Sequence, residues 1–356
     1  MNITDVIITG AGASAAEGIP IQSQLFKKFW VRNSESLLKV RSIQNKDQLR
    51  AFDIVLDNID RYLQRFFNVD VLSIQDDKVQ FPTFEEALGI LDLALTYGEE
   101  FEDSSEGDIK TIQSDLIFLI AKSILQEMPN SPQCHVKLVD ELFRMGRLQS
   151  TAFLTTNYDL LLDDALIQKV GSGNLDYRVV LLRNDESYVI GNESITLLKL
   201  HGSLDWIYCP SSKTLIKESV ERIIPNDSMT PFFECANIPR PVIIPPSFIK
   251  SLSNFYIQQI WMEAEKIIRD AERLIFCGYS FPDADLNFKY LLKRSQLGSK
   301  TLREVVVINN HQGKAASVLA EESNRYRRFF GPGINVKFSD WSFGDFANNP
   351  SIIDRN

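Results

Sequence analysis

The sequence is poor in the residues that build metal sites and cross-links. It has four cysteines and three histidines in 356 residues, and no two cysteines form a CxxC pair. Widely spaced cysteines predict neither a zinc ribbon nor a disulfide framework, and they suit a reducing cytoplasm. We therefore expect no metal in the functional site. The cysteines are Cys134, Cys209, Cys235 and Cys277.

Long apolar runs and excess positive charge are also missing. The apolar segment 116–121 is among the longest, far short of the roughly 18 residues that cross a bilayer. No basic segment followed by an apolar one opens the chain, so we expect no signal peptide and a cytoplasmic location. A net charge of −9 gives no electrostatic footprint for nucleic acid or membrane, and we expect neither as a direct partner. Residues 325–330, with three arginines and two phenylalanines, are a local exception typical of a solvated helix end or a subunit contact; contact with nucleic acid is the less favoured alternative.

A glycine-rich loop after the first apolar segment is the most informative feature present. Residues 6–8 (VII) predict a short buried strand that runs into residues 9–14 (TGAGAS), and residues 15–17 can start a helix. Glycines at such a turn let backbone N–H groups approach a pyrophosphate, and the helix N-terminus adds a positive field. The loop predicts nucleotide binding but not the reaction.

Further short apolar segments predict a parallel sheet. Each is followed by turn or helix signals, a pattern typical of strands that are buried on both faces. We therefore predict an α/β fold, Rossmann-like, with a parallel sheet. The segments are 151–155, 195–200, 242–244, 274–277 and 305–308.

The region between the first two predicted strands has helical character. Thr83 and Glu86 have capping-box spacing before an apolar stripe, and Ser131-Pro132 predicts a helix that runs to about Met145. The acidic segment 99–108 indicates a solvated loop. We predict one domain, 1–356, with a helical insertion at 30–150; residues 151–356 complete the Rossmann-like core, with an irregular excursion at 210–240 and a short C-terminal tail.

Polar clusters follow several of the predicted strands, where open α/β sheets bind ligands. Each cluster has a structural alternative: Asn157 and Asp159 could cap the next helix, His201 could be structural, and Gly278 could simply end a strand. Several polar strand ends beside a glycine loop nevertheless favour one shared site. The clusters are 155–159 (TTNYD), 201–203 (HGS), 278–281 (GYSF) and 309–310 (NN).

This ordered set of motifs resembles the sirtuin family, and most closely its bacterial sirtuin-like branch associated with anti-phage defence. The similar segments run from residue 6 to about residue 310, nearly the whole chain. The glycine loop alone is weak evidence, whereas the ordered set is strong. The motifs are Gly10–Ser14 with Gly18-Ile19-Pro20, Thr156–Asp159, His201-Gly202, Gly278-Tyr279-Ser280 and Ile308-Asn309.

The resemblance implies that NAD⁺ is the substrate and that the bond between nicotinamide and ribose is cleaved. It implies that Asn157 positions the ribose or an attacking water with Asp159 beside it, and that His201 is the general base. An imidazole suits that role, because its unperturbed pKa lies near neutrality. The implied cofactor-binding residues are Gly10, Ala11, Gly12 and Ser14 at the phosphates, with Gly278, Ser280 and Asn309 toward the adenosine.

Departures from the family pattern favour water as the acceptor of the ribose. Protein-deacylating sirtuins follow Gly-Ile-Pro with Asp-Phe-Arg, where this chain has Ile21-Gln22-Ser23. The CxxC pairs of their zinc ribbon are absent. Their Phe-Gly-Glu element is replaced by residues 245–248 (PPSF), and prolines lack the donors that pair an added peptide strand.

The sequence thus predicts an NAD⁺ glycohydrolase that depletes NAD⁺ in anti-phage defence. The alternatives are an NAD-dependent protein deacylase and a non-catalytic scaffold that binds NAD⁺ or ADP-ribose. We expect no sensor domain after residue 310, so regulation should come from self-assembly or a separate partner. A homo-oligomer is expected, and the resemblance implies a HerA-like ring ATPase as partner.

Overall fold

The computed structural model describes residues 3–43, 49–73, 79–101, 104–182, 194–209, 212–220, 241–244, 254–282 and 285–351. The chain divides into two compact units. Unit 1 comprises Met1–Ile19, Met128–Ser203 and Ser251–Asn356, and unit 2 comprises Pro20–Glu127 and Leu204–Lys250. Of the helices expected between residues 30 and 150, those up to residue 127 lie in unit 2 and the last lies in unit 1.

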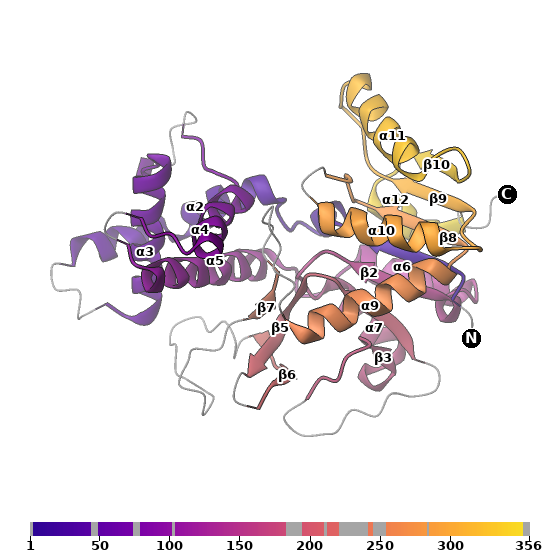
Figure 1. Cartoon of the computed structure of the whole chain (residues 1–356), viewed down its shortest axis with the longest axis horizontal. Helices are drawn as coiled ribbons and strands as arrows, with labels where there is room; N and C mark the ends of the chain where they lie inside the picture. The colour runs from indigo at the N-terminus through magenta and orange to yellow at the C-terminus, as the bar shows by residue number, and fades with distance from the viewer. Residues whose placement is uncertain are drawn as a thin grey trace. The chain divides into compact units, whose positions relative to one another are not determined.

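Unit 1 is built on a parallel sheet in the order β10-β9-β8-β1-β2-β4-β3, which confirms the predicted α/β fold (Figure 1). Every strand pair described in it is parallel. The central strands are buried along their whole length, as their apolar sequences predict. The strands are β1 (Asp5–Thr9), β2 (Thr151–Thr155), β3 (Leu175–Asp176), β4 (Ile195–Lys199), β8 (Arg273–Cys277), β9 (Glu304–Ile308) and β10 (Asn335–Ser339).

Helices cover this sheet and pack on one another. Helix α6 packs against α7 and α12, and α9 packs against α10. The helices of unit 1 are α1 (Ala11–Ala15), α6 (Cys134–Arg144), α7 (Leu161–Val170), α9 (Phe255–Asp270), α10 (Leu286–Gly298), α11 (Ala316–Phe330) and α12 (Phe343–Asn348), with short 3₁₀ helices η3 (Leu148–Ser150) and η4 (Ser172–Asn174).

The strand order reverses at β1. From β1 the sheet extends through β2 and β4 on one side and through β8, β9 and β10 on the other. Open α/β sheets bind ligands outside the carboxyl ends of the strands at such a switch point. The fold therefore places the glycine loop, which follows β1, at the expected position for a ligand.

One predicted strand belongs to a different sheet. Residues 242–244 were expected in the parallel sheet, but β7 (Pro241–Ile243) joins β5 (Gly202–Cys209) and β6 (Thr214–Lys217) in the order β6-β5-β7. The run is only three residues long, and such a run does not specify its partner strands. Strands β3, β5, β6 and β10 were not predicted. Strand β10 lies in the region expected to be a short C-terminal tail, and it adds an outer strand to the main sheet. Residues 210–211, 221–240 and 245–250 of the excursion and the Pro-Pro segment lie outside the described part.

Unit 2 contains the helices of the region 20–127. The side chain of Thr83 accepts a hydrogen bond from the backbone N–H of Glu86, which confirms the predicted N-cap. Phe26 stacks on Phe84 with ring centroids 3.8 Å apart, and Tyr62 Oη donates to the carbonyl of Ala87. The helices are α2 (Gln22–Ser42), α3 (Ala51–Phe67), α4 (Phe84–Tyr97) and α5 (Glu106–Glu127), with the 3₁₀ helix η2 (Val71–Ser73).

Helix boundaries correct three local predictions. The acidic segment 99–108 is not a loop throughout, because α5 starts at Glu106 and acidic residues stabilise a helix N-terminus. Residues 15–17 do not start a helix; α1 begins inside the glycine loop and ends at Ala15. Helix α6 starts at Cys134 rather than after Ser131. None of the helices described is long and apolar enough to cross a membrane.

The start of α6 is fixed by a buried carboxylate. Glu17 accepts hydrogen bonds from the backbone N–H groups of Gln133 and His135 and lies 3.0 Å from His135 Nδ1. Burial raises the pKa of this carboxyl, but the hydrogen bonds from the His135 side chain and from both backbone groups outweigh it, and the pKa falls from 4.5 to about 2. Glu17 thus caps α6 from the segment that follows the glycine loop.

Acid should therefore weaken the fold partly through Glu17. Because its pKa is lower in the folded state than in the unfolded state, its contribution is complete above about pH 4.5 and is lost as the pH falls toward about 2. We expect Glu17→Gln to lower the unfolding free energy at neutral pH and to flatten its fall between about pH 5 and 3. Urea unfolding across this range, with Glu35→Gln at an exposed position of α2 as the control, checks the expectation. A Glu17→Gln curve parallel to that of the wild type would contradict it.

Candidate functional site

The glycine loop is held against the turn that follows β8. The N–H of Gly10 donates to the carbonyl of Cys277 over 3.0 Å, and the N–H of Gly12 donates to the carbonyl of Gly278 over 2.8 Å. Gly278 has a φ of +61°, a conformation that favours glycine. Ala11 and Gly12 are exposed at the carboxyl end of β1, so a ligand can reach the loop there.

Contact with the Gly278 turn is what requires glycine at positions 10 and 12. A Cβ at Gly12 would lie 2.7 Å from Gly278 Cα, and one at Gly10 would lie 2.8 Å from the Gly278 carbonyl oxygen. A Cβ at Gly278 would lie 2.3 Å from the nitrogen of Ala13. The glycines thus serve backbone packing between β1 and β8, and their role as a phosphate cradle stays a prediction.

We expect Gly12→Ala to destabilise unit 1 by about 1–3 kcal/mol, the usual cost of forcing extra atoms into a packed position. The added Cβ meets backbone atoms of Gly278, which cannot rotate away as a flexible side chain can. Gly89→Ala in α4 is the matched control, because a Cβ there meets no atom within 4 Å. Thermal unfolding compares the variants, and equal midpoints for the two would contradict this packing role.

Three predicted residues meet in one hydrogen-bond chain. The side-chain nitrogen of Asn157 donates to the Ser14 hydroxyl over 2.7 Å and to the carbonyl of Gly10 over 2.9 Å. Ser14 in turn donates to Asp159 Oδ2 over 2.6 Å, and Asp159 Oδ1 accepts from the N–H of Leu161. Asn157 and Asp159 therefore tie the turn after β2 to the glycine loop, and Asp159 also caps the start of α7, in line with the structural alternative.

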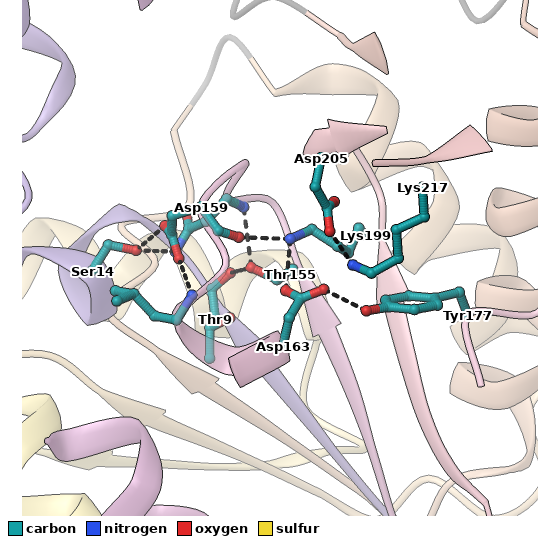
Figure 2. A network of polar contacts seen from close by, with 11 residues as sticks. Thr9, Ser14, Thr155, Asp159, Asp163, Tyr177, Lys199, Asp205 and Lys217 are labelled. Carbon is teal, nitrogen blue, oxygen red and sulfur yellow. Dashed lines mark hydrogen bonds and ion pairs between the residues drawn. The ribbon is translucent and has the colours of Figure 1, made fainter. Parts of the chain in front are cut away.

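A buried lysine holds the same turn through two hydrogen bonds (Figure 2). Lys199, at the end of β4, is fully buried, and its Nζ donates to the carbonyl oxygen of Asp159 over 2.6 Å and to Asp163 Oδ2 over 2.7 Å. Tyr177 Oη donates to the other oxygen of Asp163 over 2.7 Å. These residues were not predicted from the sequence, although a single charge inside the apolar segment 195–200 was a signal for them.

His201 lies in the turn between β4 and β5. Its Nδ1 is 3.1 Å from the carbonyl oxygen of Thr156, the residue before Asn157. A carbonyl oxygen can only accept, so Nδ1 carries the proton and the basic lone pair is on Nε2. Gly202 turns the chain with a φ of +84°, and Trp261 Nε1 donates to the carbonyl of Leu200 over 2.7 Å. The imidazole is thus buried, fixed and brought next to the Asn157 turn.

The residues predicted at the adenosine side differ in their surroundings. Ser280 is exposed, whereas the Asn309 amide is buried and donates to the carbonyl of Tyr279 over 3.0 Å and to Glu322. His311 and Glu322 also form a hydrogen-bonded pair. The structure therefore uses the Asn309 side chain to hold the Tyr279 backbone, and its predicted contact with adenosine stays a prediction.

The remaining groups to consider are the cysteine at the end of β8 and the side chains that could bind a metal ion. Cys277 is fully buried at the end of β8, and burial raises its pKa, which keeps the thiol protonated and unreactive. Within the described residues, no group of three or more His, Cys, Asp or Glu side chains could hold a metal ion.

Comparisons with known proteins give a family match and similarities to solved structures. Residues 151–327 match the family model of the SIR2-like domain. The solved structure of Sir2Tm bound to a propionylated peptide is 17% identical, with a TM-score of 0.42 over 99% of this chain and 93% of that chain. A structure described as the structural basis for sirtuin substrate affinity is 16% identical, with a TM-score of 0.41. The similarity covers 99% of this chain and 93% of that chain. No curated protein matches the chain significantly. The described sheet makes this chain an α/β protein, and residues 151–327 are similar to the SIR2-like domain.

Proposed function

We propose that this chain is an NAD⁺ glycohydrolase, which converts NAD⁺ and water to nicotinamide and ADP-ribose. The observation that carries the proposal is the state of His201: its Nδ1–H is committed to Thr156, which makes Nε2 the basic atom beside the Asn157 turn. The exposed loop residues Ala11 and Gly12 at the switch point and the SIR2-like domain support NAD⁺ as the substrate.

In the proposed reaction, the side chains of this site would act on the ribose and on the water that attacks it. Cleavage of the bond between nicotinamide and ribose builds positive charge on the ribose, so the reaction gains from an oriented nucleophile and a nearby base. His201 would take a proton from water or a ribose hydroxyl at Nε2. Asn157, whose side-chain nitrogen is held by Gly10 and Ser14, would present its oxygen in a fixed direction to the ribose or the water. Ser14 and Asp159 would hold Asn157 in place.

Incubation of the full chain with NAD⁺ and no acyl-peptide tests the proposal, with nicotinamide and ADP-ribose quantified by chromatography. The proposal expects both products in equal amounts. Release of nicotinamide only when an acyl-lysine peptide is present would identify a deacylase instead. Binding of NAD⁺ without turnover, alone and in the assembled complex, would identify a scaffold.

We further propose that the enzyme is a regulated, NAD⁺-depleting effector of anti-phage defence, which works as a homo-oligomer or with a HerA-like ring ATPase. The resemblance of the motifs to the defence branch supports this role. Co-expression with a ring ATPase encoded beside the gene tests it: the expected result is a joint complex and a fall in cellular NAD⁺ on infection. Unchanged NAD⁺ with intact phage growth would contradict the role.

A further inference from the structure

A strongly basic cavity lies on unit 1, at the end of the parallel strands opposite the candidate site. Its volume is about 1150 Å³. Arg303 immediately precedes β9 and Asn335 opens β10, so the cavity lies at the amino ends of these parallel strands. The predicted NAD⁺ site is at the carboxyl ends. The lining residues include Arg303, Arg325, Arg327 and Arg328 and the turn Gly331-Pro332-Gly333.

The positive charge extends into a neighbouring cavity. A second cavity of about 280 Å³ shares Arg325 and Arg328 with the first and adds Lys289 and Lys293 from α10. Among the residues that line either cavity, Glu321 is the acidic one. So much positive charge in one place is unexpected in a chain with a net charge of −9.

The arginines of the larger cavity have no acidic partner among the residues that the structure describes. Arg327 lies over the ring of Phe338, with 5.1 Å from its Cζ to the centroid, and none of the four forms an ion pair with a residue that the structure describes. The Nε of Arg325 is buried and has no hydrogen-bond partner. Nearby Glu304 is already paired with Arg273 and Lys337. Guanidinium groups that gather around a cavity and have no acidic partner among the described residues favour an anionic ligand.

The end of α11 by itself would explain only part of this arrangement. Arg327 and Arg328 lie in the last turn of α11, where cations stabilise the helix C-terminus. That effect does not account for Arg303, which lies just before β9, or for Lys289 and Lys293, which lie on α10. Three separate parts of the chain, the residue before β9, helix α11 and helix α10, bring basic side chains to one pair of cavities.

We propose that this pair of cavities binds a phosphorylated small molecule of about the size of a mononucleotide. Guanidinium groups match phosphate oxygens in geometry and charge. Pro332, Ile334 and Val336 offer an apolar wall for the rest of the ligand. The overall negative charge disfavours a long polyanion such as nucleic acid. The proposal does not rest on NAD⁺ hydrolysis.

Calorimetric titration of the full chain with inorganic tripolyphosphate tests this site. Arg325→Gln/Arg328→Gln should weaken binding at least ~10-fold, since two charge-assisted contacts are lost. Arg144→Gln/Arg294→Gln is the matched control: it removes the same charge from exposed arginines of unit 1 and should change affinity less than ~2-fold. Saturating NAD⁺ should not displace the probe.

Several results would overturn the proposal. These are no binding of tripolyphosphate by the wild type, equal weakening in the two double variants, or displacement of the probe by NAD⁺. Tighter binding of a single-stranded oligonucleotide with the same dependence on Arg325 and Arg328 would replace the small ligand with nucleic acid. Circular dichroism and thermal unfolding of each variant separate loss of binding from loss of fold.

Discussion

Lys199→Met should be among the most destabilising single substitutions in unit 1, at about 3–5 kcal/mol. The substitution keeps an extended side chain at a fully buried position but removes the ammonium that faces Asp163 and the carbonyl of Asp159. Asp163 keeps its bond from Tyr177, but its carboxylate stays buried without the lysine charge. Urea unfolding of the full chain, followed by near-UV circular dichroism, measures the loss.

Lys169→Met is the matched control for this prediction. Lys169 forms an ion pair with Asp140 over 2.8 Å, but both side chains are partly exposed, and such pairs contribute only about 0–1 kcal/mol. A second test is the double variant Lys199→Met/Asp163→Asn, which removes both charges and should recover part of the loss. Equal effects of Lys199→Met and Lys169→Met would mean that the buried pair does not support the turn at 157–159.

His201→Asn should reduce release of nicotinamide from NAD⁺ at least ~100-fold, the scale of losing one acid–base group. An asparagine amide can replace the imidazole as the donor to the carbonyl of Thr156 while offering no group that titrates near neutral pH. The variant therefore separates catalysis from positioning. Nicotinamide formation under saturating NAD⁺ gives the rate, and a titration with NAD⁺ gives the affinity.

His201→Ala and Ser14→Ala complete this test. His201→Ala loses the hydrogen bond to Thr156 as well as the base, so it should be no more active than His201→Asn. Ser14→Ala removes the hydroxyl between Asn157 and Asp159, and it should weaken turnover without removing the His201 base. Activity of His201→Asn within a few-fold of the wild type would remove His201 from the catalytic residues.

Much of the central sheet could be predicted from the sequence, because its strands are apolar on both faces. The segments at β1, β2, β4, β8 and β9 each carry four or more buried residues in a row. By contrast, β10 has no fully buried residue, so its sequence does not stand out. The start of helix α6 was mispredicted for a different reason. It depends on Glu17, which is more than 100 residues away in the chain.

The sequence likewise predicted the location of the candidate site but not the contacts within it. Glycine, asparagine, aspartate and histidine after apolar strands identify the region, because the carboxyl ends of parallel strands meet at one edge. The contacts that orient these residues are made by residues distant in the sequence. The carbonyl of Thr156 selects the tautomer of His201, and Lys199 donates to the carbonyl of Asp159. A sequence pattern does not specify which buried donor meets which acceptor.

The sequence by itself determined the parallel α/β core and the polar strand ends, since local apolar runs and turn residues encode both. Only the tertiary structure decided that Gly12 packs on Gly278, that Asp163 accepts hydrogen bonds from both Lys199 and Tyr177, and that basic residues from three parts of the chain line one pair of cavities. The physical reason is that these interactions join residues distant in the chain, and their energies depend on burial and geometry that arise only when the chain is packed.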